Sequence, residues 1–185
     1  MINKKSDDGF KDTPRIYIQG KKLIDFISKI EEIHKNDDSE IFISYSHNDS
    51  KYVMEFKVQL EAFKRIRKIK YFDDTQIKQG EKWKYEISKA LSSAKVAILM
   101  ISAHFFKSDF IYEKEYKAIL EHEKNKGLQI LWIPVRPANY EMFEISNFQA
   151  IKLKNKNLKP LSAMDINERD EIYVEAIRRI DEIFK

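Results

Sequence analysis

Short apolar runs alternate with longer amphipathic stretches along most of the chain. Runs of this length, rich in β-branched and aromatic residues, are typical of buried strands, and they occupy residues 41–45, 69–72, 96–101, 130–135 and, as a weaker fifth candidate, 150–153. Between them, apolar residues recur at helical spacing, which predicts helices over 52–63, 83–91, 109–124 and 167–184. Strands that alternate with helices indicate right-handed βαβ connections. We therefore predict an α/β domain with a parallel sheet and helices on both faces.

The first 38 residues follow a different pattern. They begin with a polar stretch that holds Gly9 and Pro14, and apolar residues at helical spacing between 21 and 34 predict one added N-terminal helix. We expect a leader at 1–38 and a single domain at 39–185. The start lacks the apolar run of a signal peptide, and no stretch approaches 18 uncharged apolar residues. The expectation is a cytoplasmic protein without a membrane segment.

Composition excludes several kinds of chemistry. The 34 Lys and Arg residues nearly balance 30 Asp and Glu residues, and no long block of like charge is present. This charge pattern indicates a solvated surface and no direct binding of nucleic acid. Without cysteine, the chain forms no disulfides, thiolate zinc sites or cysteine nucleophiles. Four scattered histidines suggest no metal site, and four glycines without a G-x-G-x-x-G or Walker pattern argue against a dehydrogenase or a phosphate loop.

Ligands of parallel α/β sheets bind beyond the carboxyl ends of the strands. This rule predicts a functional rim formed by residues 45–49, 73–80, 102–110 and 136–140. Within it, the polar cluster Ser46-His-Asn-Asp49 is interpreted as a turn and a helix cap.

The rim segments also resemble a known family. The strand Ile41-Phe-Ile-Ser-Tyr-Ser46 resembles the first strand of Toll/interleukin-1 receptor (TIR) domains, and Phe72-Asp-Asp-Thr-Gln-Ile-Lys-Gln-Gly-Glu-Lys-Trp83 is similar to their loop after the second strand. The segment Leu99-Met-Ile-Ser-Ala-His-Phe-Phe-Lys-Ser-Asp-Phe110, continued by Ile-Tyr-Glu-Lys-Glu115, is similar to the entry into their catalytic helix. Residues 160–163 and 167–170 resemble bacterial members. The resemblance covers residues 40–185 and implies the TIR fold, with a flavodoxin-like, five-stranded parallel sheet.

The resemblance implies a catalytic glutamate at Glu115. Phe110 fills the place of the aromatic residue that the family has four or five positions earlier, where Trp or Tyr is commoner. Helical periodicity distinguishes Glu115 from its neighbour Glu113 independently of the family. At 100° per residue, Glu115 falls within the apolar arc between Ile111 and Ile119, whereas Glu113 falls on the opposite side. The alternative is a glutamate at the edge of the buried face that is paired with a lysine.

Other candidate substrate contacts follow from the same resemblance and from the rim. Tyr45, Ser46 and His47 follow the first strand, where the family places substrate contacts, although Tyr45 also fits a packing role and His47 a turn. Asp73 fits either a ribose contact or a helix cap. Phe110, with Ile111 beside it, fits either a stack on nicotinamide or packing at the helix start.

Both tryptophans are expected in the core: Trp83 at helical spacing with the apolar residues after it, and Trp132 by strand alternation.

The resemblance leaves two functions open. One is an NAD⁺ glycohydrolase or cyclase (an NAD⁺ nucleosidase) that releases nicotinamide and either ADP-ribose or a cyclic isomer, with NAD⁺ as substrate and no cofactor. Such an enzyme is expected to be activated by self-association through the 73–83 loop, in bacterial defence against phage. The other is a non-catalytic adaptor or effector that acts through TIR–TIR association. A receiver-like phosphoacceptor is disfavoured, because no phosphoacceptor aspartate ends the third strand and Lys95 stands at its start.

Overall fold

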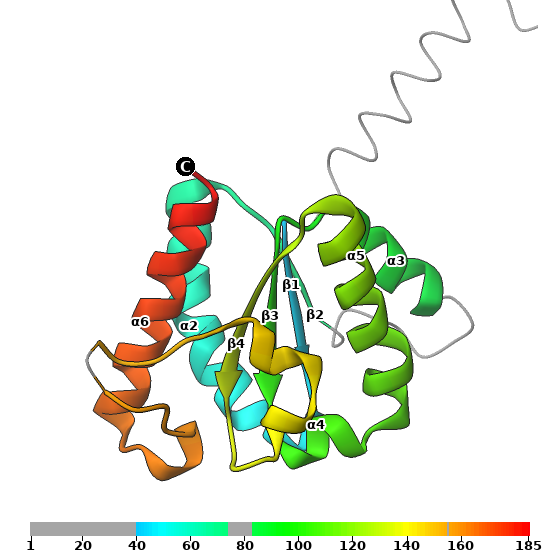
Figure 1. Cartoon of the computed structure of the whole chain (residues 1–185). Coiled ribbons are helices and arrows are strands. Elements are labelled where there is room, and N and C mark those ends of the chain that lie inside the picture. The colour runs from blue at the N-terminus through cyan, green and yellow to red at the C-terminus, as the bar shows by residue number, and fades with distance from the viewer. Residues whose placement is uncertain (1–39, 74–82, 155) are drawn as a thin grey trace, which may run out of the picture. The chain divides into compact units, whose positions relative to one another are not determined.

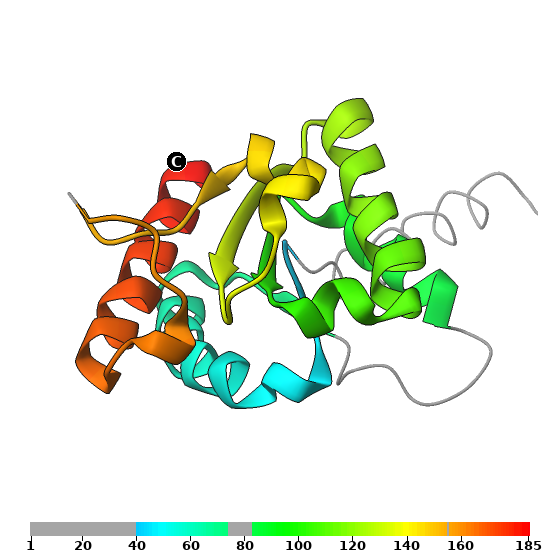
Figure 2. The same cartoon turned by 60° about the horizontal axis from the view of Figure 1, so that its bottom comes forward.

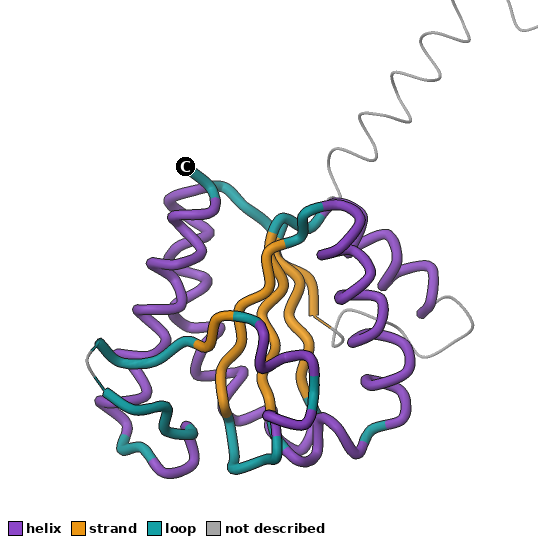
Figure 3. The backbone as a smooth tube through the Cα atoms, viewed as in Figure 1, coloured by secondary structure: helices purple, strands orange, loops and turns teal. Residues whose placement is uncertain are grey.

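Five parallel strands form a single sheet. The computed structural model describes residues 40–73, 83–154 and 156–185. The strand order is β2-β1-β3-β4-β5, and the strands lie side by side between the helices (Figure 3). Their bounds are β1 Ile41–Tyr45, β2 Tyr71–Asp73, β3 Val96–Ile101, β4 Gln129–Pro134 and β5 Gln149–Ala150. The predicted five-stranded parallel α/β fold is confirmed.

Helices cover both faces of this sheet. α2 and α6 lie on one side, and α3 and α5 lie on the other (Figure 1). The α-helices are α2 Ser50–Arg67, α3 Trp83–Ser93, α4 Ala103–Lys107, α5 Lys117–Lys126 and α6 Ile166–Ile183. Short helical turns are η1 His47–Asp49, η3 Ile111–Tyr116, η4 Tyr140–Met142, η5 Glu144–Asn147 and η6 Leu161–Ala163. Among the described residues, none of these helices has the length and apolarity needed to cross a bilayer.

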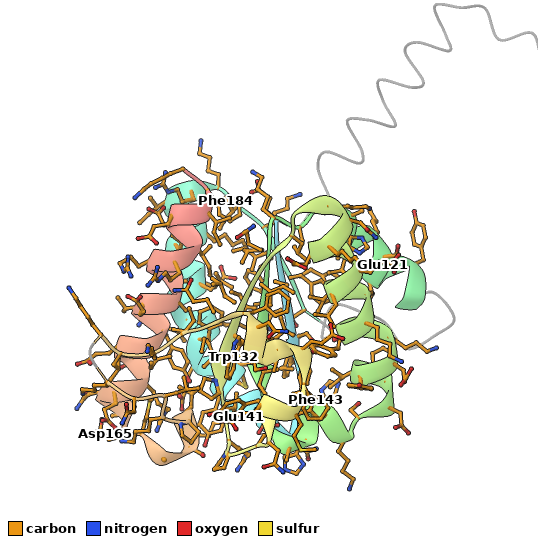
Figure 4. The ribbon with its side chains drawn as sticks, viewed as in Figure 1. Glu121, Trp132, Glu141, Phe143, Asp165 and Phe184 are labelled. Atoms are coloured by element: carbon orange, nitrogen blue, oxygen red, sulfur yellow. The ribbon has the colours of Figure 1, made fainter. Side chains whose placement is uncertain are left out.

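Strand alternation divides the apolar residues into two cores. In β1, Ile41 and Ile43 pack toward α2 and α6, whereas Phe42 packs toward α3 and α5. The same alternation runs through β3 and β4, so that each central strand is buried on both faces. Trp132 belongs to the α3/α5 core, as predicted, and its indole N–H donates to the carbonyl of Phe148 at 3.0 Å. Figure 4 labels Trp132, which lies in β4.

Local signals fix several helix ends. Asp165 and Glu168 form a capping box at the start of α6, and Asp165 and Phe184 mark the two ends of this helix in Figure 4. Gly127 ends α5 with a φ of 71°, a left-handed conformation that glycine adopts without a Cβ penalty.

Some predicted boundaries were wrong. β2 begins at Tyr71 and includes Asp73, and β5 ends at Ala150 instead of 153. The helix expected at 109–124 is preceded by the unpredicted α4, whose first turn is capped by the Ser102 hydroxyl accepting from the Phe105 N–H at 3.2 Å. The predicted helix at 21–34, the loop at 74–82 and the side chain of Trp83 lie outside the described residues.

Candidate functional site

Buried polar side chains gather at the carboxyl edge of the sheet. Within the described ranges they are Ser44, Ser46, Asp49, Asp73, Ser102 and Glu115. Ser44, Ser46, Asp73 and Ser102 lie at the end of a strand or directly after one, and Asp49 ends the short turn η1 that follows β1. Glu115 is bonded to Ser44. Figure 2 turns this edge toward the reader. Because burying a polar group costs free energy unless it is hydrogen-bonded, this edge is the candidate functional site.

Glu115 is the buried glutamate of this set. Its side chain is 3% exposed, and its Oε2 accepts a hydrogen bond of 2.6 Å from the Ser44 hydroxyl. Side chains alternate between the two faces of a strand, so Ser44 shares a face with Phe42 and lies opposite Tyr45. Ser44 therefore faces α5. The burial predicted for Glu115 is therefore confirmed, while its catalytic role stays a prediction. Ser44 was not predicted as a site residue, although the alternation of side chains along β1 could have placed it on the same face of the sheet as Glu115.

A π-helical turn carries Glu115. Residues Ile111–Tyr116 form this turn, which continues directly into α5. Its i→i+5 spacing is rare, occurs mostly as single turns within α-helices, and is frequent at functional sites. The wider turn lets two consecutive residues, Glu115 and Tyr116, both face the interior. Burial raises the pKa of the Tyr116 hydroxyl to about 12, so that it stays protonated at neutral pH.

Glu113 has a different environment on the same helix. Its side chain is exposed and forms an ion pair of 2.6 Å with Lys117, one α-helical turn later. The hydrogen bond from Lys117 to Glu113 raises the pKa of the lysine. The helix thus presents one glutamate to solvent and the other to the sheet.

A second buried carboxylate belongs to Asp49. It is 0% exposed, and its two oxygens accept from the Ser102 hydroxyl at 2.5 Å and from Arg136 Nε at 2.7 Å. As the cluster predicted, a turn precedes α2 and Asp49 is its N-cap residue, but the Asp49 side chain makes no capping bond and turns toward these partners instead. Hydrogen bonding to Asp49 raises the pKa of the Arg136 guanidinium. The rim rule selected the segments of Ser102 and Arg136, but nothing in the sequence indicated that they meet.

The remaining candidates after β1 differ in exposure. Tyr45 and Ser46 are buried, and Tyr45 packs in the α2/α6 core, which agrees with its packing alternative. His47 is exposed, and its ring meets that of Tyr45 edge-on at 5.9 Å between centroids. Ser46 accepts a hydrogen bond of 3.5 Å from Asn48.

Asp73 and the start of the π-turn complete the predicted set. Asp73 is buried at the end of β2, opposite Ile43 in register, and forms an ion pair of 2.7 Å with Lys57 of α2. Phe110 is 39% exposed and precedes Glu115 by five residues, the spacing of one π-turn, whereas Ile111 is buried. The structure therefore places an accessible aromatic ring directly before the π-turn that carries the buried carboxylate.

A large cavity lies away from this edge. A cavity of about 790 Å³ lies between residues 149–158 and α6, and no residue of the rim lines it. Where side chains are described, no three of the residue types that bind metals come together.

Comparisons with known proteins identify one family. Residues 41–166 match the family model described as TIR domain. An uncharacterized protein of Sinorhizobium fredii is 25% identical over 139 residues, which are 75% of this chain and 42% of that protein. The chain thus spans less than half the length of this curated relative.

Two solved structures are similar to the chain. The TIR domain of a Toll-related receptor from Hydra magnipapillata is 16% identical, with a TM-score of 0.50 over 80% of this chain and 99% of that one. A metazoan TIR-STING receptor from C. gigas is 18% identical, with a TM-score of 0.44 over 74% of this chain and 40% of that one. The Hydra domain agrees with the fold described above.

Proposed function

The chain belongs to the TIR domain family, and from this premise we propose that it cleaves NAD⁺ at the bond between nicotinamide and ribose, with Glu115 as its catalytic residue. The observation that carries the proposal is the Glu115 carboxylate, buried at the carboxyl edge of the sheet and held by the Ser44 hydroxyl at 2.6 Å. Carboxylates are rarely buried unless they are paired or used. The position and the π-turn that creates it both support a functional role.

One carboxylate is sufficient for this reaction. Ordinary glycosidases need a second carboxyl group to protonate a poor leaving group. Nicotinamide in NAD⁺ is cationic and departs as a neutral molecule, so the leaving group needs no proton. The role left for Glu115 is to orient the ribose hydroxyls and to stabilise the positive charge that develops on the sugar in the transition state.

The bond changes balance with NAD⁺ alone in the cyclisation and with water as the second reactant in the hydrolysis. The C1′–N bond breaks, and its electron pair leaves with the nicotinamide nitrogen. Attack of water on C1′ gives ADP-ribose and one proton, whereas attack by an atom of the adenine or the other ribose gives a cyclic isomer. Both outcomes use the same cleavage step and the same carboxylate.

The neighbouring side chains have proposed roles in substrate binding. Phe110 offers an accessible ring one π-turn before Glu115, suited to stacking on nicotinamide. Ser46 and His47, in the turn after β1, and Asp73, at the end of β2, fit contacts to the ribose or its substituents. Tyr45 and Ile111 are buried, and they support the walls of the site instead.

The biological setting is also part of the proposal. Bacterial TIR enzymes suggest defence against phage in the cytoplasm, with activation by self-association through the 73–83 loop. Because the curated relative is more than twice as long as the matched part, a sensor outside this chain fits that setting.

The experiment compares Glu115→Ala with Glu113→Ala as a matched control. Both remove one glutamate from the same helix, but Glu113 is exposed and paired with Lys117. Purified protein at several concentrations is incubated with NAD⁺, and released nicotinamide is quantified by chromatography. We expect release by wild type and Glu113→Ala and a loss of at least about 100-fold in Glu115→Ala. Equal release by both variants would remove Glu115 from the mechanism.

The adaptor function predicts another result. In that case no concentration of wild type releases nicotinamide, and association still rises with protein concentration. Light scattering across the same concentration series separates this outcome from a failure of the protein to fold.

A further inference from the structure

Arg136 is held in a fixed orientation beside the rim. It follows β4, and its Nε donates to Asp49 at 2.7 Å. Asp49 is itself fixed by Ser102, which follows β3. The guanidinium carbon lies 5.7 Å from the centroid of the Tyr52 ring, so the plane is also supported by an aromatic ring. An arginine restrained in this way loses little further freedom when it binds a ligand.

The outer donors of Arg136 are available. Its side chain is 41% exposed, and its terminal nitrogens make no hydrogen bond to any residue that the structure describes. Arg169 provides an internal contrast over the same Tyr52 ring. That arginine is 12% exposed and uses all three nitrogens, two on Glu55 and one on the carbonyl of Met164. Arg169 is thus saturated by the protein, whereas Arg136 is not.

Positive charge is in excess around Tyr52. Lys51, Arg136 and Arg169 all lie within 6 Å of the ring centroid, at 5.8, 5.7 and 5.9 Å. The carboxylates bonded in this cluster belong to Asp49 and Glu55. Three cations against two anions favour an anionic ligand at this place.

Arg136 lies beside the switch point of the sheet, where a ligand is expected to bind. β1 leads to α2 on one face and β3 leads toward α5 on the other, which makes the gap between them the expected ligand crevice. The Asp49–Ser102 bond crosses that gap. Asp49, the anchor of Arg136, stands five residues after Ser44, the partner of Glu115, so their Cα atoms are at most about 18 Å apart. One dinucleotide can reach both.

We propose that Arg136 binds the diphosphate group of the dinucleotide substrate through its two terminal nitrogens. This inference rests on the proposed function, since it names a second contact of the same ligand. The planar fork of an arginine matches the geometry of phosphate oxygens, which a lysine cannot reproduce.

The test uses Arg136→Lys, because a lysine still offers a charge to Asp49 and the protein is expected to remain folded. Arg178→Lys on α6 is the matched control, an exposed arginine outside the rim. Calorimetry measures the affinity of the full chain for ADP-ribose and for inorganic pyrophosphate. We expect Arg136→Lys to weaken both by roughly tenfold and Arg178→Lys to change neither.

The outcomes separate this inference from the proposed function, because binding requires no turnover. Weaker binding in Arg136→Lys supports the diphosphate contact even if wild type releases no nicotinamide. Unchanged affinity for ADP-ribose overturns it, even if NAD⁺ is cleaved. An effect confined to pyrophosphate also overturns it, because the contact is then made by free phosphate and not by the dinucleotide.

Discussion

The two ends of the β-sheet differ in what they bury. At the amino ends of the strands, backbone hydrogen bonds join Lys95 to Glu40 at 2.9 Å and Gln129 to Lys95 at 3.0 Å. The charged side chains there point outward, and those of Glu40 and Lys95 form an ion pair at the surface. At the carboxyl ends, two carboxylates with exposed fractions of 0% and 3%, those of Asp49 and Glu115, are enclosed with serine hydroxyls.

The difference distinguishes an end of the sheet that follows the ordinary rules of burial from an end that departs from them. The amino ends follow the ordinary rule that charges stay in solvent. The carboxyl ends break the rule at several positions within one edge, and such local violations are expected where a protein gives up stability for a site. The carboxyl edge is therefore favoured as the location of the proposed site, without reference to any ligand.

The largest effect on stability is expected from Arg136→Ala. This change leaves the buried carboxylate of Asp49 without its cation. Because Arg136 is itself 41% exposed, solvent screens part of the interaction, and we expect the free energy of unfolding to fall by roughly 2–3 kcal/mol. Lys95→Ala at the amino end removes an exposed partner of Glu40 and should cost less than about 1 kcal/mol. Urea denaturation of both variants measures the difference. Equal losses would mean that the two ends are energetically alike.

A smaller effect is expected from Ser44→Ala. The change removes the hydroxyl that donates to the buried Glu115, which should cost about 2 kcal/mol and reduce the rate of NAD⁺ cleavage. Ser92→Ala, on the exposed end of α3, is the control and should stay within about 0.5 kcal/mol of wild type. If Ser44→Ala matches this control in both stability and rate, the bond between Ser44 and Glu115 has no role in either.

The smallest effect concerns Glu55, beside the rim. Burial alone would raise its pKa, but hydrogen bonds from Arg169 and Tyr173 outweigh burial and lower the pKa below the usual 4.5. A lowered pKa in the folded state means that Glu55 stabilises the protein above about pH 4.5, and that this contribution disappears as the pH falls through the folded pKa.

The variant Glu55→Gln isolates this contribution. It should be less stable than wild type at pH 7 by roughly 1 kcal/mol or less, with the difference shrinking toward pH 3 in a series of urea titrations. A difference that grows as the pH falls would contradict the assigned direction.

Local patterns in the sequence were sufficient to predict the sheet and the burial of Glu115. Strand runs and helical spacing depend on neighbouring residues, so the bounds of β1 and β3 and the apolar arc around Glu115 could be read directly. The rim rule then selected the segments that hold Asp49, Ser102 and Arg136.

Pairings across long sequence separations could not be predicted in this way. Ser44 and Glu115 are 71 positions apart, and Asp49 and Arg136 are 87 apart. The π-turn was missed as well, because a helical wheel assumes 100° per residue throughout. Asp49 occupies the N-cap position that the local pattern predicted, but its carboxylate bonds a tertiary partner, Arg136, instead of capping the helix.

The proposed reaction depends on the negative charge of Glu115, and Glu115→Gln removes that charge while keeping the size of the side chain and an oxygen for Ser44. Proton NMR follows the conversion of NAD⁺ to free nicotinamide by wild type and by this variant under identical conditions. The account predicts an initial rate at least about 100-fold lower for Glu115→Gln. Equal rates in the two proteins, or no conversion by folded wild type at any concentration, would contradict it.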